Sequence, residues 1–371
     1  MKSILSFILI IVLVVSCTNE NSEQNLIYNS KIDINKKLLL IDSIKINYTK
    51  KNTIGKIGAS TFKWKNYVLF TDVINKQIVA FSSKFKFIKK IGREGKGPGE
   101  YIYSPFPIFS MENTDDSLYL FSPKLRKINI YDSKLNYIES KNLDSKVIYQ
   151  LVPALKSNNN FIFSAVYPYS VMKTEYYKKY KSLIILDEKC KFSEEVLKWD
   201  KIYYNKKILG FLGTNTNTLL TWGNKKKWYA LQSGSFYINE LDEKYNIIKT
   251  FGRKPIFYKP IPKKVDPVKT QSSFKSFVEY KTNVTDFVKI DFDRLNNNIF
   301  VQYVNITPDQ IYKKNIFAGK WFLQIYNKDH DVIYDSQIKG VFLFVDKGKI
   351  YVLEQETPKF SLIKIYKLNN L

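Results

Sequence analysis

The sequence predicts an all-β protein, a six-bladed β-propeller with four-stranded antiparallel blades. Three observations predict this fold class. A strand–turn–strand pattern recurs along the chain, further β-type runs precede the copies, and one strand near the N-terminus has no blade of its own. The 371 residues are 44% hydrophobic and 16% aromatic, which provides a large core and excludes a disordered chain.

The recurring unit is a strand that ends in a bulky residue, a short turn rich in Asp, Asn and Ser, and a second strand. Such turn residues are typical of β-hairpins. The bulky residues are Phe81, Tyr131, Leu186, Leu241, Tyr326 and, at the end of the chain, Tyr366. They lie about 40 to 55 residues apart, with one gap of about 85, and this period is typical of propeller blades. Six copies predict six blades.

Other β-type runs complete the blades. Residues 67–71, 117–121, 161–165 and 298–303 each precede a hairpin, so that a unit has about four strands. The long gap predicts an insertion in blade five, at residues 254–276 and 305–320, with a degenerate seventh blade as the alternative. The last blade, residues 341–366, lacks an outer strand, and we expect residues 38–47 to supply it and close the ring.

The N-terminus is typical of a bacterial lipoprotein. Lys2 precedes an apolar run of about 12 residues, too short to span a bilayer, and the run ends in Val-Val-Ser-Cys17. This ending resembles a lipobox, in which the cysteine is acylated and the signal is cut before it; a secretory signal with an incidental cysteine is the alternative. We therefore expect a signal peptide over residues 1–16, a flexible tether over 17–36 and the propeller over 37–371.

One glycine-rich stretch is distinctive: Ile91-Gly-Arg-Glu-Gly-Lys-Gly-Pro-Gly-Glu-Tyr101. It resembles a connector of the six-bladed β-propeller lipoproteins of Bacteroidota, which are similar to NHL-repeat and TolB-like propellers. The candidate site residues in it are Gly92, Arg93, Gly95, Gly97, Gly99, Glu100 and Tyr101. Successive N–H groups of such a loop can form an anion-binding nest. Alternatively, the loop only connects two blades and is held by a pair between Arg93 and Glu100.

Composition limits the partners. The formal charge is +25, from 59 Lys and Arg against 34 Asp and Glu, and the lysines are scattered along the chain. The expected location outside the cytoplasm excludes nucleic acid as a partner. Acylated Cys17 predicts attachment to a membrane, expected to be the outer membrane on its periplasmic or cell-surface side. Adhesion of the basic protein to a membrane surface is a further hypothesis.

Few residues suit catalysis. With Cys17 acylated, Cys190 has no disulfide partner, and its place between two lysines at a predicted turn suggests either a slightly lowered pKa or an incidental residue. The single histidine, His330, lies in a predicted solvated hairpin turn, which disfavours a catalytic triad or a zinc site. Asp291, Asp293 and Glu279 are candidate carboxylates in blade five, although the two aspartates fit a turn after a strand. We expect no cofactor and no metal.

The tyrosines at 176–177, 180 and 203–204 lie among lysines and suggest either stacking platforms for sugars or core residues. The leading interpretation is a binding or scaffold propeller for a protein or a glycan. The alternative is a carboxylate-dependent, lactonase- or lyase-like enzyme acting on carbohydrate in the propeller channel. That activity requires acidic residues from different blades to converge within about 5 to 9 Å.

Overall fold

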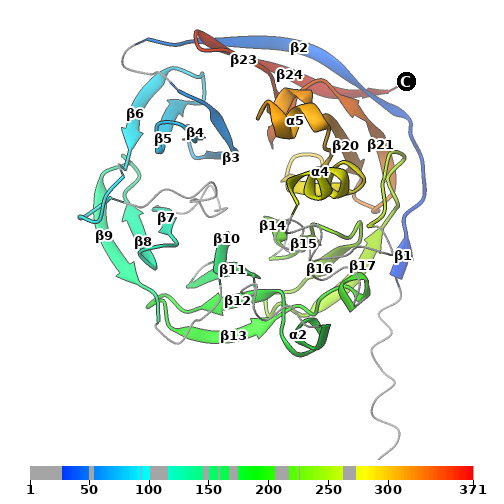
Figure 1. The fold of residues 1–371 in the computed structure, drawn as a ribbon, viewed down its shortest axis with the longest axis horizontal. Helices are drawn as coiled ribbons and strands as arrows, with labels where there is room; N and C mark the ends of the chain where they lie inside the picture. Colours follow the sequence, from blue (N-terminus) through cyan, green and yellow to red (C-terminus); the bar gives the residue numbers. More distant parts are fainter. Residues whose placement is uncertain are drawn as a thin grey trace, which may run out of the picture.

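The computed structural model describes residues 27–49, 54–92, 94–100, 116–144, 150–157, 159–166, 174–204, 217–224, 226–261 and 273–370. The described strands form six sheets, which are arranged as a ring (Figure 1). This confirms the predicted six-bladed β-propeller. None of the described helices is both long enough and apolar enough to span a membrane.

The first three blades follow the chain. Blade one contains β3 (Ile57–Trp64), β4 (Tyr67–Asp72), β5 (Gln77–Ser82) and β6 (Phe87–Ile91). The described strands of blade two are β7 (Leu118–Ser122), β8 (Lys127–Tyr131) and β9 (Tyr137–Asn142). Blade three contains β10 (Gln150–Ser157), β11 (Asn160–Val166), β12 (Leu183–Leu186) and β13 (Phe192–Val196). Neighbouring strands in these sheets are antiparallel, as predicted.

The last three blades also take strands from the N-terminal segment. Blade four contains β14 (Thr218–Trp222), β15 (Trp228–Gln232), β16 (Ile238–Leu241) and β17 (Ile247–Gly252), with β1 (Ile27–Asn29) parallel to β17 at its edge. Blade five contains β18 (Thr285–Asp293), β19 (Asn298–Asn305), β20 (Lys320–Tyr326) and β21 (Val332–Ile338). Blade six contains β22 (Val341–Asp346), β23 (Lys349–Glu356) and β24 (Phe360–Asn370), with β2 (Lys36–Asn47) outermost.

The ring closes as the sequence predicts. Strand β2 pairs antiparallel with β24, from Lys36 opposite Asn370 to Asn47 opposite Phe360 (Figure 1). The pairing supplies the missing outer strand of blade six and covers an edge that would otherwise expose unpaired backbone groups. Within the segment expected to be a tether, residues 27–29 form β1, and Ile32 bridges to Val332 at the edge of blade five.

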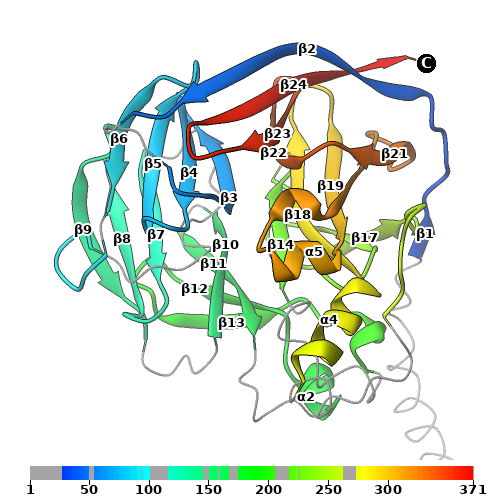
Figure 2. The same cartoon turned by 45° about the horizontal axis from the view of Figure 1, so that its top comes forward.

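The two faces of the ring differ. We call loop face the side with the connections between blades and between second and third strands, and turn face the side with the hairpin turns between first and second and between third and fourth strands. Every described helix lies in a loop-face connection (Figure 2): α2 (Thr174–Lys179), η2 (Lys201–Tyr204), α4 (Phe274–Thr282), α5 (Pro308–Tyr312) and η4 (Ile316–Ala318). Capping starts α4 and α5, because the side chains of Ser273 and Thr307 accept hydrogen bonds from backbone N–H groups three residues later. Helix α5 lies inside the predicted insertion at residues 305–320, whereas α4 begins at the end of the one predicted at residues 254–276 and continues to Thr282.

The hairpin turns between third and fourth strands repeat one geometry. The side chains of Asp132, Asp187, Asp242 and Asn327 each accept hydrogen bonds from the N–H groups two and four residues later. The residue three positions after each has a positive φ, which is the pattern of a type I turn followed by a left-handed residue. In blade one Ser82 takes the same place and accepts from Lys86.

The residue with positive φ in these turns is buried in each of five blades. We call this set the turn plugs: Phe85, Leu135, Cys190, Tyr245 and His330. They contact the preceding blade, because the Phe85 ring packs on Tyr351, Tyr245 accepts from Asn160, and His330 stacks on Phe251. The prediction of a solvated His330 was therefore wrong, because this side chain is only 9% exposed. Of the two alternatives for Cys190, the lowered pKa is wrong, since burial raises the pKa of its thiol to about 12.

Candidate functional site

The glycine-rich loop is fastened to blade two. Three buried side chains on one face of β8 donate to its carbonyl oxygens: Lys127 to Gly97 (2.9 Å), Asn129 to Glu100 (2.9 Å) and Tyr131 to Gly99 (2.7 Å). Gly92 and Gly99 adopt positive φ. Two of the predicted site residues, Arg93 and Tyr101, lie outside the described residues, as does Cys17.

A backbone N–H group of the loop binds a carboxylate from the loop itself, that of Glu100. The Gly97 N–H donates to the Glu100 carboxylate (2.8 Å), and a Cβ added at Gly95 or Gly97 would lie 2.1 Å or 3.0 Å from the same oxygen. The glycines therefore leave the space that this carboxylate fills. This geometry supports the interpretation of the loop as a connector between blades.

The carboxylates predicted for blade five lie on two elements, the two aspartates on β18 and Glu279 on α4. Asp291 lies inside β18, not in a turn, and accepts from the N–H groups of Phe292 and Val345, both at 2.9 Å. Asp293 ends the strand and accepts from Leu295 (3.1 Å), whereas Glu279 lies in α4. Among the described residues, no group of three or more His, Cys, Asp or Glu side chains is arranged to hold a metal ion.

Basic side chains hold the innermost strands together. Lys289 on β18 donates to the carbonyl oxygens of Thr61 (2.7 Å) on β3 and Leu343 on β22, and burial lowers its pKa to about 8. Lys63 pairs with Asp346 at 2.7 Å. These contacts tie blades five, six and one, so the described charges there have structural partners.

A second aromatic core lies under the loop face. Tyr177 and Tyr203, from two of the tyrosine runs, stack with ring centroids 5.8 Å apart and are buried with Trp199 and Tyr280. The Tyr203 hydroxyl accepts from the Gly234 N–H (2.7 Å). For these two tyrosines the core interpretation is confirmed. They support the helices of the loop face rather than a sugar.

The helices carry exposed aromatic residues. Phe274 on α4 and Tyr312 on α5 are 59% and 58% exposed, and their rings meet edge to face with centroids 5.7 Å apart. Lys313 follows Tyr312 and pairs with Asp309 within the same turn of helix (2.8 Å). This arrangement offers an exposed apolar contact on the loop face, next to an ion pair.

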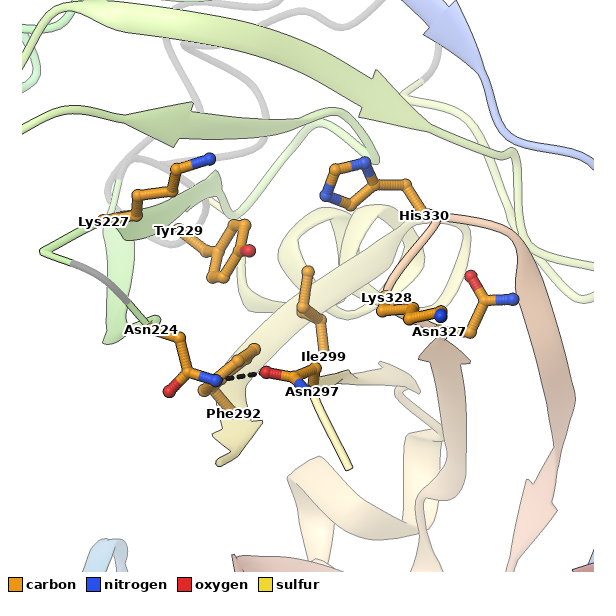
Figure 3. Close-up of a pocket in the computed structure, with 9 residues that line it drawn as sticks. All are labelled: Asn224, Lys227, Tyr229, Phe292, Asn297, Ile299, Asn327, Lys328 and His330. Atoms are coloured by element: carbon orange, nitrogen blue, oxygen red, sulfur yellow. Dashed lines mark hydrogen bonds between the residues drawn. The ribbon is translucent and has the colours of Figure 1, made fainter. Parts of the chain in front are cut away.

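A pocket of about 330 Å³ lies on the turn face between blades four and five (Figure 3). Its polar lining consists of Asn224, Lys227, Asn297, Asn327, Lys328 and His330, and its apolar lining consists of Tyr229, Phe292 and Ile299. The side-chain amide of Asn224 donates to Asn297 Oδ1 and joins the two blades across the pocket. The lining thus has two ammonium groups and three amides but no carboxylate.

His330 is the buried member of this lining and is held in place by two charged neighbours. Lys249 Nζ lies 3.0 Å from its Nδ1, and because an ammonium only donates, Nδ1 accepts and Nε2 carries the hydrogen that faces Glu240 (3.4 Å). The hydrogen bond from His330 and the ion pair with Lys227 hold the pKa of Glu240 at about 2. Glu240 therefore orients two of the lining side chains.

Sequence reasoning missed this pocket because it placed His330 in solvent. A signal was available, since the other turn plugs, at the position three residues after Ser82, Asp132, Asp187 and Asp242, are Phe, Leu, Cys and Tyr. A histidine in that series differs from its counterparts in polarity. It therefore requires polar partners wherever the position is buried.

The family model described as DUF5128, 6-bladed beta-propeller, matches residues 16–353. A member of the DUF4221 family from Bacteroides vulgatus ATCC 8482 is 13% identical, with 91% of this chain and 100% of that chain covered and a TM-score of 0.68. A protein from Bacteroides fragilis NCTC 9343 is 12% identical, with 92% and 99% covered and a TM-score of 0.62. At these identities the likeness shows the fold alone. No curated protein matches the chain.

Proposed function

The chain belongs to the DUF5128 family of six-bladed β-propellers, and we propose that it is a non-catalytic binding protein anchored outside the cytoplasm through Cys17. Its loop face binds a partner, a protein or a glycan, and the propeller acts as a rigid scaffold for that face. The anchor places it in the outer membrane, on the periplasmic or the cell-surface side.

The exposed Phe274–Tyr312 pair is the observation that carries the binding function. Large aromatic side chains are enriched at protein interfaces, because they bury much apolar area at a low cost in conformational entropy. The pair lies on helices inserted into loop-face connections, and the buried core of Tyr177, Trp199 and Tyr203 supports this face. The apolar character of the contact favours a protein over a glycan.

A crosslinking experiment tests the loop face. Native membranes carrying the wild-type chain are crosslinked, and partners captured with it are identified by mass spectrometry. We expect the Phe274→Ala/Tyr312→Ala variant to lose its partner, and the Phe192→Ala variant to keep it. Phe192 is a matched control, because it is also exposed (42%) but lies on the outer strand of blade three.

The same capture in both variants would contradict the assignment of the loop face. Binding of the wild-type chain to an array of acidic and neutral glycans, lost only in the Phe274→Ala/Tyr312→Ala variant, would make the partner a glycan. The anchor is tested separately: a Cys17→Ser variant should no longer incorporate labelled palmitate and should move to the soluble fraction. If the wild-type protein incorporates no labelled palmitate, the lipoprotein assignment is wrong.

A further inference from the structure

We propose that the pocket between blades four and five binds the phosphate of an anionic phospholipid headgroup and seats the turn face on the membrane. The proposal rests on the anchored location proposed above. It adds a second, non-covalent contact with the bilayer and fixes which face of the propeller points away from it.

The N-terminal segment is attached at the interface between blades four and five. Strand β1 runs parallel to the last residues of β17, with Ile27 opposite Thr250 and Asn29 opposite Gly252. The Tyr28 hydroxyl donates to Asp331 (3.1 Å), and the Lys31 N–H donates to the same oxygen (3.2 Å). The chain is therefore attached to the propeller between blades four and five.

The lipid-bearing residue lies a short way along the chain from β1. Nine residues lie between Cys17 and Ile27, so ten residue steps join them, and a fully extended chain spans at most about 3.6 Å per step. The acyl chains thus lie within about 36 Å of β1. A tether of this length restricts the orientation of a propeller, whereas one reaching to residue 36 would not.

The pocket and the site where the N-terminal segment is attached share one hairpin turn, residues 327–331. Asp331 in this turn holds β1, and Asn327, Lys328 and His330 of the same turn line the pocket (Figure 3). The pocket therefore opens on the turn face beside the point where the anchored segment joins the propeller.

The side chains that line the pocket suit a phosphate group. A phosphate accepts hydrogen bonds and carries negative charge, and the lining offers the ammonium groups of Lys227 and Lys328 and the amides of Asn224, Asn297 and Asn327. Asn327 uses its Oδ1 for two N–H groups of the turn, which leaves its amide nitrogen as a donor toward a ligand.

Two of the neighbouring acids are already engaged by other groups of the protein. Glu240 is buried and engaged by Lys227 and His330, and Asp331 is engaged by the N-terminal segment. Asp329 is exposed beside Lys328, whose ammonium makes no ion pair within the part of the chain that the structure describes. The net charge of the lining is positive. A lysine near an anionic bilayer strengthens binding about fivefold.

Vesicle co-sedimentation tests the proposal with the mature chain, residues 17–371, carrying Cys17→Ser, so that no acyl chain contributes. We expect binding to phosphatidylcholine vesicles containing phosphatidylglycerol and none to phosphatidylcholine alone. Lys328→Glu should weaken binding at least fivefold. The control Lys134→Glu changes the net charge equally on the turn face of blade two and should leave binding unchanged.

A second variant separates the pocket from overall charge. Lys227→Gln/Glu240→Gln removes one charge of each sign, keeps the net charge and leaves no unpaired buried carboxylate; it should also weaken vesicle binding. Equal losses in Lys328→Glu and Lys134→Glu would overturn the proposal in favour of diffuse attraction. Saturable binding of glycerol phosphate or inorganic phosphate without vesicle binding would also overturn it, by making the ligand a soluble phosphate. Because acylation is absent throughout, these outcomes are independent of the Cys17 test.

Discussion

Glu356 provides the sharpest prediction about the stability of the ring. It ends β23 in the last blade, and its carboxylate accepts a hydrogen bond from the N–H of Ile57 (2.6 Å) in the first blade. Burial raises the pKa of Glu356 from 4.5 to about 7, although the Ile57 N–H and nearby Lys56 partly oppose the shift. We predict that Glu356→Gln stabilises the protein at neutral and basic pH, because glutamine keeps the acceptor oxygen and carries no charge.

The size and sign of the effect follow from linkage. A shift of about 2.5 pKa units corresponds to about 3 kcal/mol, an upper limit because the side chain is only partly buried. The pKa is raised in the folded state, so the folded protein holds the proton more tightly than the unfolded chain. The destabilisation is therefore absent below about pH 4.5, grows as the pH rises to about 7, and is complete above it.

Urea denaturation at several pH values between 4.5 and 8.5 measures this effect. The free energy of unfolding of Glu356→Gln should exceed that of the wild type by up to about 3 kcal/mol at pH 8, and the two should converge at pH 4.5. Glu243→Gln is the control, because Glu243 is exposed and pairs with exposed Lys226; its change should stay within about 0.5 kcal/mol. A constant offset between Glu356→Gln and wild type across this range would refute the reasoning.

Three further predictions concern the repeated turns. Asp242→Ala removes the acceptor of two turn N–H groups and should lower the free energy of unfolding by about 1 to 2 kcal/mol in urea. Leu135→Ala empties a position that is 2% exposed and should cost about 2 to 5 kcal/mol; a loss below 0.5 kcal/mol would contradict its role as a turn plug. In a chain carrying Cys17→Ser, Cys190 should react with a thiol reagent at pH 8 only after denaturant is added, because it is buried and its pKa is raised. Rapid labelling of the native protein would show that assignment to be wrong.

The sequence predicted the fold because the required information is local and repeated. Each hairpin shows alternation, a bulky last residue and a turn that starts with Asp, Asn or Ser, and six copies fix the number of blades. Closure by β2 was predictable because two incomplete pieces, residues 38–47 and the last blade, fit each other. Helix α5 lay within a predicted insertion and α4 only began in one, and the repeat spacing did not indicate on which face of the ring the helices lie.

The charged residues were harder to place, because their positions depend on contacts between blades. Asp291 resembles a turn residue in sequence, yet it lies in β18, where the Val345 N–H of the next blade donates a hydrogen bond to its carboxylate. Lys289 is buried because two carbonyl oxygens of other blades face its ammonium group. Such partners are more than 50 residues away, so a pattern within one repeat does not show them.

The turn plugs show how the pocket arises from the repeat. The fold needs a bulky side chain at this position to fill the interface with the preceding blade, and Phe, Leu, Cys and Tyr meet that need with apolar contact or one hydrogen bond. Histidine fills the same space but brings two ring nitrogens that require partners when buried. Glu240 and Lys249 of blade four supply them, and Glu240 also holds Lys227. Replacing His330 by leucine would keep the plug but remove the group that faces Glu240. This one departure from the repeat therefore adds a hydrogen-bonded polar group to the pocket, at the interface where the N-terminal segment is attached.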